Sequence, residues 1–307
     1  MHTALLFPGQ GAQRPGFLKR LPEHPAVRAT LAEAAQVLER DVDRLDEPAV
    51  LQSTAAVQLG TVIAGVAAAR ALEAEGVTAD AVAGLSVGAY AAAVTCGAIA
   101  FADALGLVSL RGEAMARAAP HGYGMTALLG IGERSARALV ARVGARLPLY
   151  LASINAATEV VVSGTDAALA AAAEAAHAAG ASAQRLNVSI PSHCEIMQEV
   201  STVLSEAMAP VSLEQPRLPY ISNHRARVAS SAAEVAEDLI LNVSRTVRWH
   251  DSMRLLHELG CRLYVEMPPG HVLTALVTAS LADVRAVALD DTPLPTALTL
   301  ARRAPGR

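Results

Sequence analysis

Short apolar segments alternate with longer alanine-rich segments over the first 118 residues of the chain. The short segments are continuously apolar, as in strands buried on both faces, and the longer ones repeat apolar positions at helical spacing. This alternation favours an α/β fold with a largely parallel sheet. The predicted strands span residues 3–7 and 77–83, and the predicted helices span 25–38, 54–75, 89–96 and 102–118.

The pattern changes between residues 123 and 190, where we predict the order strand, helix, strand, strand, helix, strand. This order is typical of a ferredoxin-like module. We therefore expect a large α/β domain, residues 1–122 and 191–307, into which a small ferredoxin-like subdomain, residues 123–190, is inserted. The six elements are predicted at 125–131, 133–143, 149–155, 160–163, 166–179 and 182–189.

The last third of the chain contains fewer clear elements. Strands are predicted at 218–222 and 262–266, helices at 232–241 and 249–259, and a frayed tail at 293–307.

One uncharged stretch, residues 81–102, is long enough to cross a bilayer. It contains Gly84, Gly88 and Gly97, and signals for both a strand and a helix fit inside it. We therefore interpret it as a buried strand, a tight turn and a buried helix.

The charge balance limits the possible partners. The chain has 25 Lys and Arg against 29 Asp and Glu, a net charge of −4, whereas nucleic acid and anionic membranes select clustered positive charge. The cysteines, Cys96, Cys194 and Cys261, are spaced too widely for a disulfide framework or a zinc motif. The apolar run at the N-terminus is too short for a signal peptide, so we expect a soluble, cytoplasmic protein.

Residues 84–88, Gly-Leu-Ser-Val-Gly, match the G-x-S-x-G nucleophile elbow. The glycines permit a tight strand-to-helix turn that exposes the Ser86 hydroxyl beside a helix N-terminus. The predicted strand before the motif and helix after it agree with this interpretation. The alternative is a glycine-rich turn kept for packing alone.

A serine hydroxyl needs a base to become a good nucleophile. His193 stands where the small subdomain returns to the large domain, so its loop could place an imidazole over the elbow. An ordinary buried histidine is the alternative. Arg111 lies in an otherwise apolar helix, and its guanidinium would either bind a substrate carboxylate or form an internal salt bridge, for example to Glu113 or Asp103.

Five segments resemble those of the malonyl-CoA:acyl-carrier-protein transacylases in order and spacing, and the resemblance extends from Leu5 to about Thr278. It implies an α/β-hydrolase-like parallel-sheet core with an inserted ferredoxin-like subdomain, in agreement with the pattern above. The segments are 7–13 (FPGQGAQ), 84–88, the surroundings of Arg111, 191–194 (PSHC) and 269–273 (PGHVL).

The resemblance also implies a role for each matching residue. Ser86 resembles the nucleophile that carries the acyl group, His193 the base, and Arg111 the arginine that binds the free malonyl carboxylate. The backbone N–H groups of Gln10 and Val87 resemble the oxyanion hole.

Two further matches are looser. Asn242 stands where the family has a glutamine whose backbone carbonyl orients the histidine, and Asn155 aligns with an active-site asparagine. The implied reaction is a ping-pong transfer of malonyl from malonyl-CoA to a phosphopantetheine-type thiol on an acyl-carrier protein, with no metal and no tightly bound cofactor.

The elbow departs from the usual Gly-His-Ser-Leu-Gly-Glu of the family, because Leu85 and Ala89 replace the His and the Glu. These residues resemble the epsilon subunit of malonate decarboxylase, whose acceptor is that enzyme's own carrier subunit, and we expect this branch. The alternative is the transacylase of fatty-acid or polyketide synthesis. A serine esterase and a non-catalytic scaffold subunit are remote alternatives.

Overall fold

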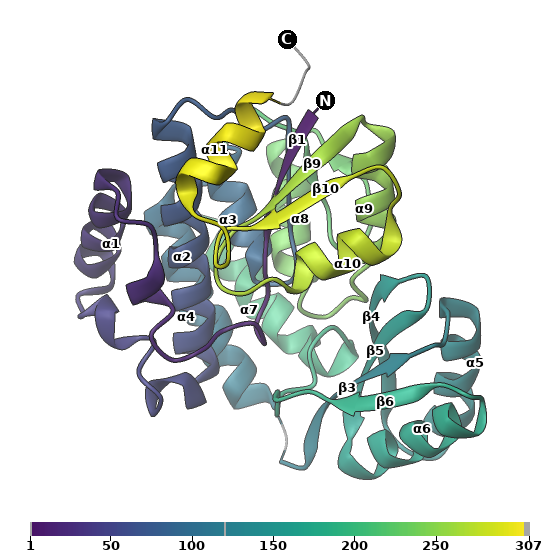
Figure 1. Cartoon of the computed structure of the whole chain (residues 1–307). Coiled ribbons are helices and arrows are strands. Elements are labelled where there is room, and N and C mark those ends of the chain that lie inside the picture. Colours follow the sequence, from purple (N-terminus) through teal and green to yellow (C-terminus); the bar gives the residue numbers. More distant parts are fainter. Residues whose placement is uncertain (1, 120, 304–307) are drawn as a thin grey trace.

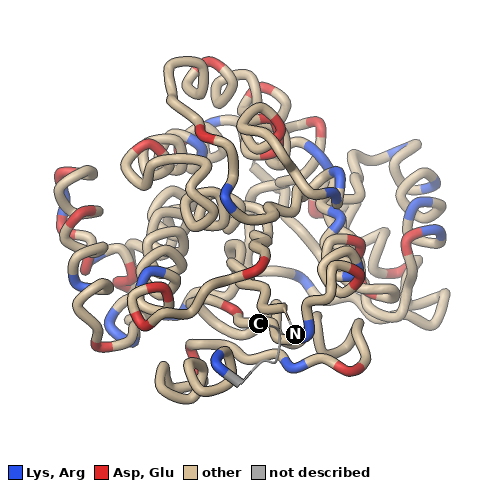
Figure 2. Tube along the Cα trace, turned by 90° about the horizontal axis from the view of Figure 1, so that it is seen from above, with Lys and Arg blue, Asp and Glu red and all other residues tan. Residues whose placement is uncertain are grey.

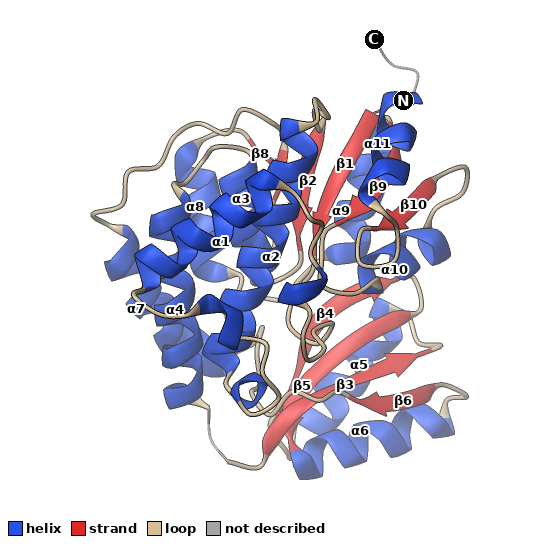
Figure 3. Ribbon diagram, turned by 60° about the vertical axis from the view of Figure 1, so that its left-hand side comes forward, coloured by secondary structure: helices blue, strands red, loops and turns tan. Residues whose placement is uncertain are grey.

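The computed structural model describes residues 2–119 and 121–303, and it contains two sheets (Figures 1 and 3). A mainly parallel sheet of six strands lies among most of the helices. A smaller antiparallel sheet of four strands lies beside it and is formed entirely by the middle of the chain. The predicted fold class is confirmed, whereas the division into 1–122 with 191–307 and 123–190 stays a prediction.

The large sheet has the strand order β10-β9-β1-β2-β7-β8, and only the edge pair β7–β8 is antiparallel. In the pairing of β1 with β2, Phe7 lies opposite Gly84. The carboxyl ends of these two parallel strands therefore reach the same edge, where α/β proteins commonly bind ligands. The strands are β1 (His2–Phe7), β2 (Ala81–Gly84), β7 (Tyr220–Ile221), β8 (Val228–Ala229), β9 (Cys261–Glu266) and β10 (Arg285–Ala288).

Helices cover both faces of this sheet because successive side chains of its strands point to opposite faces. On β1, Leu5 and Phe7 belong to the core formed with α2 and α3, whereas Leu6 belongs to the core formed with α9 and α10. The helices around the sheet are α1 (Pro25–Leu38), α2 (Thr54–Ala74), α3 (Gly88–Thr95), α4 (Phe101–Ala118), α7 (Gln198–Met208), α8 (Ala232–Leu241), α9 (Trp249–Glu258), α10 (Val272–Ser280) and α11 (Leu294–Arg303). Single 3-10 turns occur at Leu18–Arg20, Val42–Arg44, Val50–Gln52 and Glu195–Met197.

Within the described part of the chain, α2 is the one helix whose length and apolar composition would allow it to cross a membrane. Of its apolar window, 89% is buried inside the protein, as expected for a core helix. The uncharged stretch 81–102 forms β2, a turn, α3 and the start of α4, which confirms its interpretation as a buried strand, turn and helix.

The small sheet has the strand order β4-β5-β3-β6, and all its pairs are antiparallel. One face packs against two helices, and the other face turns Met125, Ala127 and Val161 toward the large sheet. The hydrogen bond from the Ile154 N–H to the Val247 carbonyl (2.8 Å) connects the two parts. The elements are β3 (Tyr123–Leu129), α5 (Glu133–Gly144), β4 (Leu149–Ala156), β5 (Glu159–Thr165), α6 (Asp166–Ala178) and β6 (Ser182–Arg185).

The structure corrects the tail and some boundaries. Residues 294–303 form α11, and its Ala297 and Leu298 are buried against the main core, so the tail is not frayed there. The strand predicted at 182–189 ends at Arg185 because the following residues leave the sheet. The predictions contained neither α7 nor α10 nor β10, and residues 304–307 lie outside the described residues.

The turn between β2 and α3 depends on two glycines that have no room for a side chain. A Cβ on Gly84 would lie 2.1 Å from the Gly88 carbonyl oxygen, and a Cβ on Gly88 would lie 2.2 Å from the Phe7 carbonyl oxygen. Both clashes involve backbone atoms, which cannot rotate away. The spacing of the two glycines is therefore a steric requirement of the turn.

We expect Gly88→Ala to lower the free energy of unfolding by about 1–3 kcal/mol, because the added methyl group forces β1 and α3 apart. Gly106→Ala is the matched control: Gly106 lies in α4 with nothing within 4 Å of its Cβ position. That substitution should raise the free energy of unfolding by roughly 0.5–1 kcal/mol through helix propensity. Urea denaturation of both variants measures the difference, and equal stabilities would contradict the steric argument.

Candidate active site

A cavity of about 300 Å³ opens at the carboxyl edge of the large sheet. One wall comes from the turn after β1 and the turn after β2. The opposite wall comes from the small sheet, through β3, β4 and β5. Ser86, His193, Arg111, Gln10 and Val87 all line this cavity, so the fold collects five predicted site residues that are distant in sequence.

Ser86 lies at the tip of the turn with a left-handed backbone conformation, φ 55°. Non-glycine residues adopt this conformation uncommonly, and residues held in such strained conformations are often found at active sites. The side chain lines the cavity, and α3 begins two residues later, so the helix N-terminus adds a positive potential beside the hydroxyl. The turn therefore has both features considered in the sequence: a steric need for glycine and a serine whose side chain lines the cavity.

The backbone N–H groups of Gln10 and Val87 are free to bind a ligand oxygen. Among the described residues, neither group makes a hydrogen bond to the protein. The bond from the Leu85 N–H to the Phe7 carbonyl (2.9 Å) holds the two turns side by side. Two such donors beside a nucleophile are the arrangement of an oxyanion hole.

His193 is buried, with 6% of its surface exposed, in a left-handed conformation (φ 63°). Its Nδ1 lies 2.5 Å from the backbone carbonyl oxygen of Asn242. A carbonyl only accepts, so Nδ1 carries the proton and Nε2 is left with a free lone pair. Burial, and next the positive charge of Arg111, lower the pKa of His193 to about 4, so the imidazole is neutral at pH 7.

Arg111 is a charged group in the interior, with 1% of its surface exposed. Charged residues lie mainly on the outer helices and loops (Figure 2). The Arg111 guanidinium donates to the Gln58 side-chain oxygen (2.6 Å), the Ser86 hydroxyl (3.2 Å) and the Asn242 side-chain oxygen (3.4 Å). Burial lowers the pKa of Arg111 to about 10, which still leaves it charged at neutral pH.

Within the described part of the chain, Arg111 does not form the internal salt bridge that was the alternative to binding a ligand. Among the described residues, Arg111 has no carboxylate within ion-pair distance. Glu113 instead pairs with Arg117 (3.8 Å) and accepts a hydrogen bond from Ser109 (3.2 Å). A buried cation surrounded by neutral groups, with Nε unpartnered, is a receptor for an anion.

Asn242 is fully buried and contacts the other residues of the site. Its carbonyl oxygen binds His193, its side-chain oxygen binds Arg111, and its side-chain nitrogen reaches the Ser86 carbonyl at 3.5 Å. Asn155 also lines the cavity, but from the opposite wall, where it donates to Glu159 (3.0 Å) and accepts from Ser153 (2.5 Å). Asn242 thus joins the central group, and Asn155 does not.

Two residues of this site were absent from the sequence predictions. Gln58 lies in the second turn of the apolar helix α2, and Asn223, the second residue after β7, accepts the Ser86 N–H (2.9 Å). A polar side chain inside an otherwise apolar helix, and a polar residue at the carboxyl end of a strand, were the available signals. Both types are also common without function, so the signals do not identify a partner.

Metal-binding groups are not gathered in the described part of the chain. No three His, Cys, Asp or Glu side chains there are grouped as the ligands of an ion would be. Cys96, Cys194 and Cys261 are free and buried. Cys194 packs beside His193 with its thiol toward the Pro191 carbonyl, and burial raises its pKa. The cytoplasmic location stays a prediction.

The low pKa of His193 predicts a specific pH dependence of stability. The folded protein keeps this imidazole neutral down to about pH 4, whereas the unfolded chain takes up the proton near pH 6.5. Stability from His193 is therefore complete above pH 6.5 and is lost as the pH falls, at up to about 1.4 kcal/mol per pH unit. Urea denaturation at pH 7, 6 and 5 measures this loss.

His193→Asn is the reference for this measurement, because an amide nitrogen can replace Nδ1 toward the Asn242 carbonyl without titrating. The difference in unfolding free energy between wild type and variant isolates His193, since all other groups are shared. A difference that stays constant from pH 7 to pH 5 would mean that His193 titrates normally in the folded protein.

Comparison with known proteins identifies the family. The model of the family described as acyl transferase domain matches residues 4–295. The malonyl CoA-acyl carrier protein transacylase of Salmonella typhimurium is 33% identical over 305 residues, which cover 97% of this chain and 98% of that protein. The protein of the same name from Bacillus subtilis is 34% identical, with coverage of 94% and 93%.

Solved structures agree with the sequence comparison. The malonyl CoA-acyl carrier protein transacylase of Coxiella burnetii matches with a TM-score of 0.94 and 31% identity, covering 99% of this chain and 98% of that one. A malonyl-transacylase in complex with its type II PKS acyl-carrier protein matches with a TM-score of 0.92 and 31% identity, covering 98% and 99%. The chain belongs to the acyl transferase family, and the protein is an acyltransferase with the fold of the malonyl CoA-acyl carrier protein transacylases.

Proposed function

We propose that this acyltransferase moves a malonyl group from malonyl-CoA to the thiol of an acyl-carrier protein through an ester on Ser86. One observation carries the proposal: the guanidinium of Arg111, which is buried with no carboxylate partner among the described residues, contacts the Ser86 hydroxyl directly. An acyl group attached to Ser86 therefore has a cation beside it.

The short distance between Arg111 and Ser86 determines which acyl group on Ser86 can also place a carboxylate on the guanidinium. Arg111 Nη2 and Ser86 Oγ are 3.2 Å apart. In a malonyl group the reacting carbonyl carbon and the free carboxylate carbon are about 2.5 Å apart, the span of two C–C bonds. The carboxylate thus reaches the guanidinium fork while the carbonyl carbon stays at the serine.

In the first half-reaction, Ser86 Oγ attacks the thioester carbonyl of malonyl-CoA, and its proton passes to Nε2 of His193. The N–H groups of Gln10 and Val87 bind the oxyanion, at roughly 3–4 kcal/mol of transition-state stabilisation for each donor. Collapse of the tetrahedral intermediate breaks the C–S bond, and the CoA sulfur takes the proton from His193. The products are CoA and the malonyl ester of Ser86.

The second half-reaction repeats these steps with a different thiol. A phosphopantetheine-type thiol of the carrier loses its proton to His193 and attacks the ester carbonyl. The C–O bond to Ser86 breaks, and Ser86 recovers the proton. His193 acts as base and then as acid in both halves, for which its neutral form and its fixed Nδ1–H are required.

The partner of His193 supports a transacylase over a serine esterase. The esterase interpretation places a carboxylate at Nδ1 to complete a Ser-His-Asp arrangement. Here the neutral Asn242 carbonyl occupies that place. A cavity lined by Ser86, His193 and Arg111 together argues against a non-catalytic scaffold subunit.

Malonyl transfer predicts a covalent adduct that intact mass spectrometry detects after brief incubation with malonyl-CoA. Wild type should gain one malonyl group and little acetyl from acetyl-CoA, because acetyl leaves the Arg111 charge unpaired. Ser86→Ala should gain neither. Arg111→Ala should lose most malonyl adduct, with a malonyl-over-acetyl preference reduced by a factor of about 100 or more.

Arg117→Ala is the control for this experiment, since Arg117 lies on the same helix but is exposed and paired with Glu113. Its adduct should match that of wild type. A malonyl adduct that survives in Ser86→Ala would contradict the proposed nucleophile.

The acceptor is the second part of the proposal. The similarity to proteins named malonyl CoA-acyl carrier protein transacylase supports a transacylase of fatty-acid or polyketide synthesis over the epsilon subunit of malonate decarboxylase. That subunit stays the second candidate because of Leu85 and Ala89 in the elbow. Ala89 is fully buried, so the glutamate usual in the family would need a partner here.

Transfer from the isolated malonyl-enzyme separates the two candidates. We expect an acyl-carrier protein bearing phosphopantetheine to remove the malonyl group at least ten times faster than the carrier subunit of malonate decarboxylase bearing its phosphoribosyl-dephospho-CoA group. Mass spectrometry of both partners measures the rates. The opposite order would assign the protein to malonate decarboxylase.

A further inference from the structure

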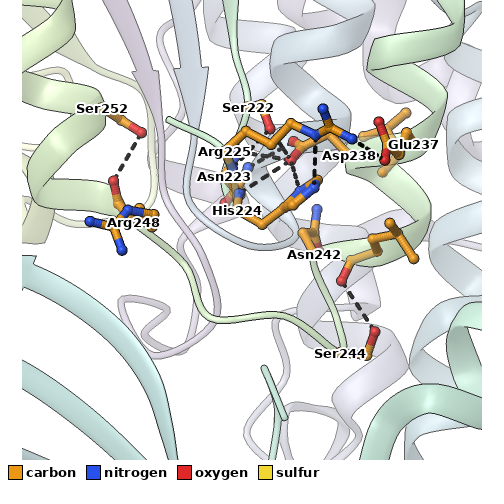
Figure 4. Close-up of polar contacts among 12 residues, drawn as sticks. Ser222, Asn223, His224, Arg225, Glu237, Asp238, Asn242, Ser244, Arg248 and Ser252 are labelled. Atoms are coloured by element: carbon orange, nitrogen blue, oxygen red, sulfur yellow. Dashed lines mark hydrogen bonds and ion pairs between the residues drawn. The ribbon is translucent and has the colours of Figure 1, made fainter. Parts of the chain in front are cut away.

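A second polar cluster lies behind the elbow, around the buried carboxylate of Asp238 on α8. The loop after β7 wraps this carboxylate, as Figure 4 shows for Ser222, Asn223 and His224. Asp238 has 0% of its surface exposed. Its oxygens accept hydrogen bonds from the Tyr220 hydroxyl (2.7 Å), the Ser222 hydroxyl (2.7 Å), the Asn223 N–H (2.8 Å), the Asn223 side-chain nitrogen (3.1 Å) and His224 Nδ1 (3.0 Å).

This carboxylate has no arginine or lysine partner among the described residues. The neighbouring Arg225 pairs with Glu237 instead. Hydrogen-bond donors from Tyr, Ser, Asn and His residues thus surround Asp238, and an apolar side chain in its place would leave several of them unpaired. The cluster is a costly arrangement to bury, which suggests that it has a use beyond packing.

Asp238 determines which way the Asn223 amide faces. A carboxylate oxygen accepts, so the NH₂ group of Asn223 must point toward Asp238. The Asn223 side-chain oxygen is then fixed on the other side, where it accepts the backbone N–H of Ser86 at 2.9 Å. The hydrogen-bonding chemistry thus sets the amide orientation.

The Ser86 N–H belongs to the residue with the left-handed conformation at the tip of the elbow. α3 begins only at Gly88, so this N–H lies outside the helix, and Asn223 is its partner. The peptide that carries it also sets the direction of the Ser86 side chain. Asn223 contacts Ser86 through this backbone bond but is not itself among the residues that line the cavity.

We propose that Asn223, oriented by Asp238, is a positioning residue that holds the elbow so that Ser86 Oγ faces the acyl carbonyl. This inference rests on the proposed malonyl transfer. Asn223 and Asp238 then affect the rate of acylation, whereas Arg111 and the cavity bind the malonyl group.

The test is single-turnover acylation by malonyl-CoA, followed by quenching and intact mass spectrometry. Asn223→Ala should lower the maximal acylation rate constant about 10- to 100-fold, as displacement of a reacting group does. The malonyl-CoA concentration for half-maximal rate should change less than about twofold, since Arg111 is untouched.

Ser222→Ala is the matched control, because Ser222 is adjacent to Asn223, donates to the same carboxylate and does not contact Ser86. It should lose thermal stability comparable to Asn223→Ala and acylate at the wild-type rate. An equal slowing in both variants would show a general structural effect and overturn the proposal.

A swap of the two side chains provides the rescue. Asn223→Asp alone places a second carboxylate beside Asp238, and the two negative charges repel. Asp238→Asn alone replaces the carboxylate that orients the Asn223 amide with a second amide. The double variant restores one amide and one carboxylate, with an acceptor still facing the Ser86 N–H, and should recover at least a third of the wild-type rate constant.

Acylation at the wild-type rate in Asn223→Ala, or no recovery in a folded double variant, would overturn the proposal. Neither result affects malonyl transfer itself, because the wild-type adduct tests that function separately. If Asp238→Asn does not fold, Asn223→Ala and Ser222→Ala still decide between the outcomes.

Discussion

The close approach of two backbone segments at the carboxyl edge of the large sheet is the constraint on which the site depends. β1 and β2 pair in parallel up to Phe7 and Gly84, and the chain then turns so sharply that Gly88 lies against the Phe7 carbonyl. This contact places the Gln10 turn beside the elbow. The proposed oxyanion hole, formed by Gln10 and Val87, which lie 77 positions apart in sequence, therefore depends on the strand register.

A second constraint is the burial of Arg111 without an anion. Gln58 from α2, Asn242 from the end of α8 and the elbow serine all accept from its guanidinium, so three elements share one cation. Neutral acceptors offset only part of the cost of desolvating a charge. In the proposed function, the malonyl carboxylate would offset the remaining desolvation cost of the Arg111 charge, and an uncharged acyl group would not.

Local signals in the sequence predicted much of this arrangement, and their success has a physical reason. The elbow glycines are sterically required, and strands β3, β4 and β5 consist mostly of buried residues, so short apolar segments mark them in the sequence. Gln58, Asn223 and Asp238 could not be predicted, because each works through a partner more than ten residues away. α11 was missed although it carries a helical pattern: Leu294, Ala297, Leu298 and Ala301 recur at helical spacing and pack on the main core.

The base and the cation of the site act on each other through the cavity. The positive charge of Arg111 is one of the two causes that lower the pKa of His193. In the proposed reaction, a malonyl carboxylate bound to Arg111 would offset that charge, so the pKa of His193 would be higher with the malonyl group bound than without it. An acetyl group provides no such compensation. In the proposed mechanism, the Arg111 guanidinium thus couples recognition of the malonyl carboxylate to the base strength of His193.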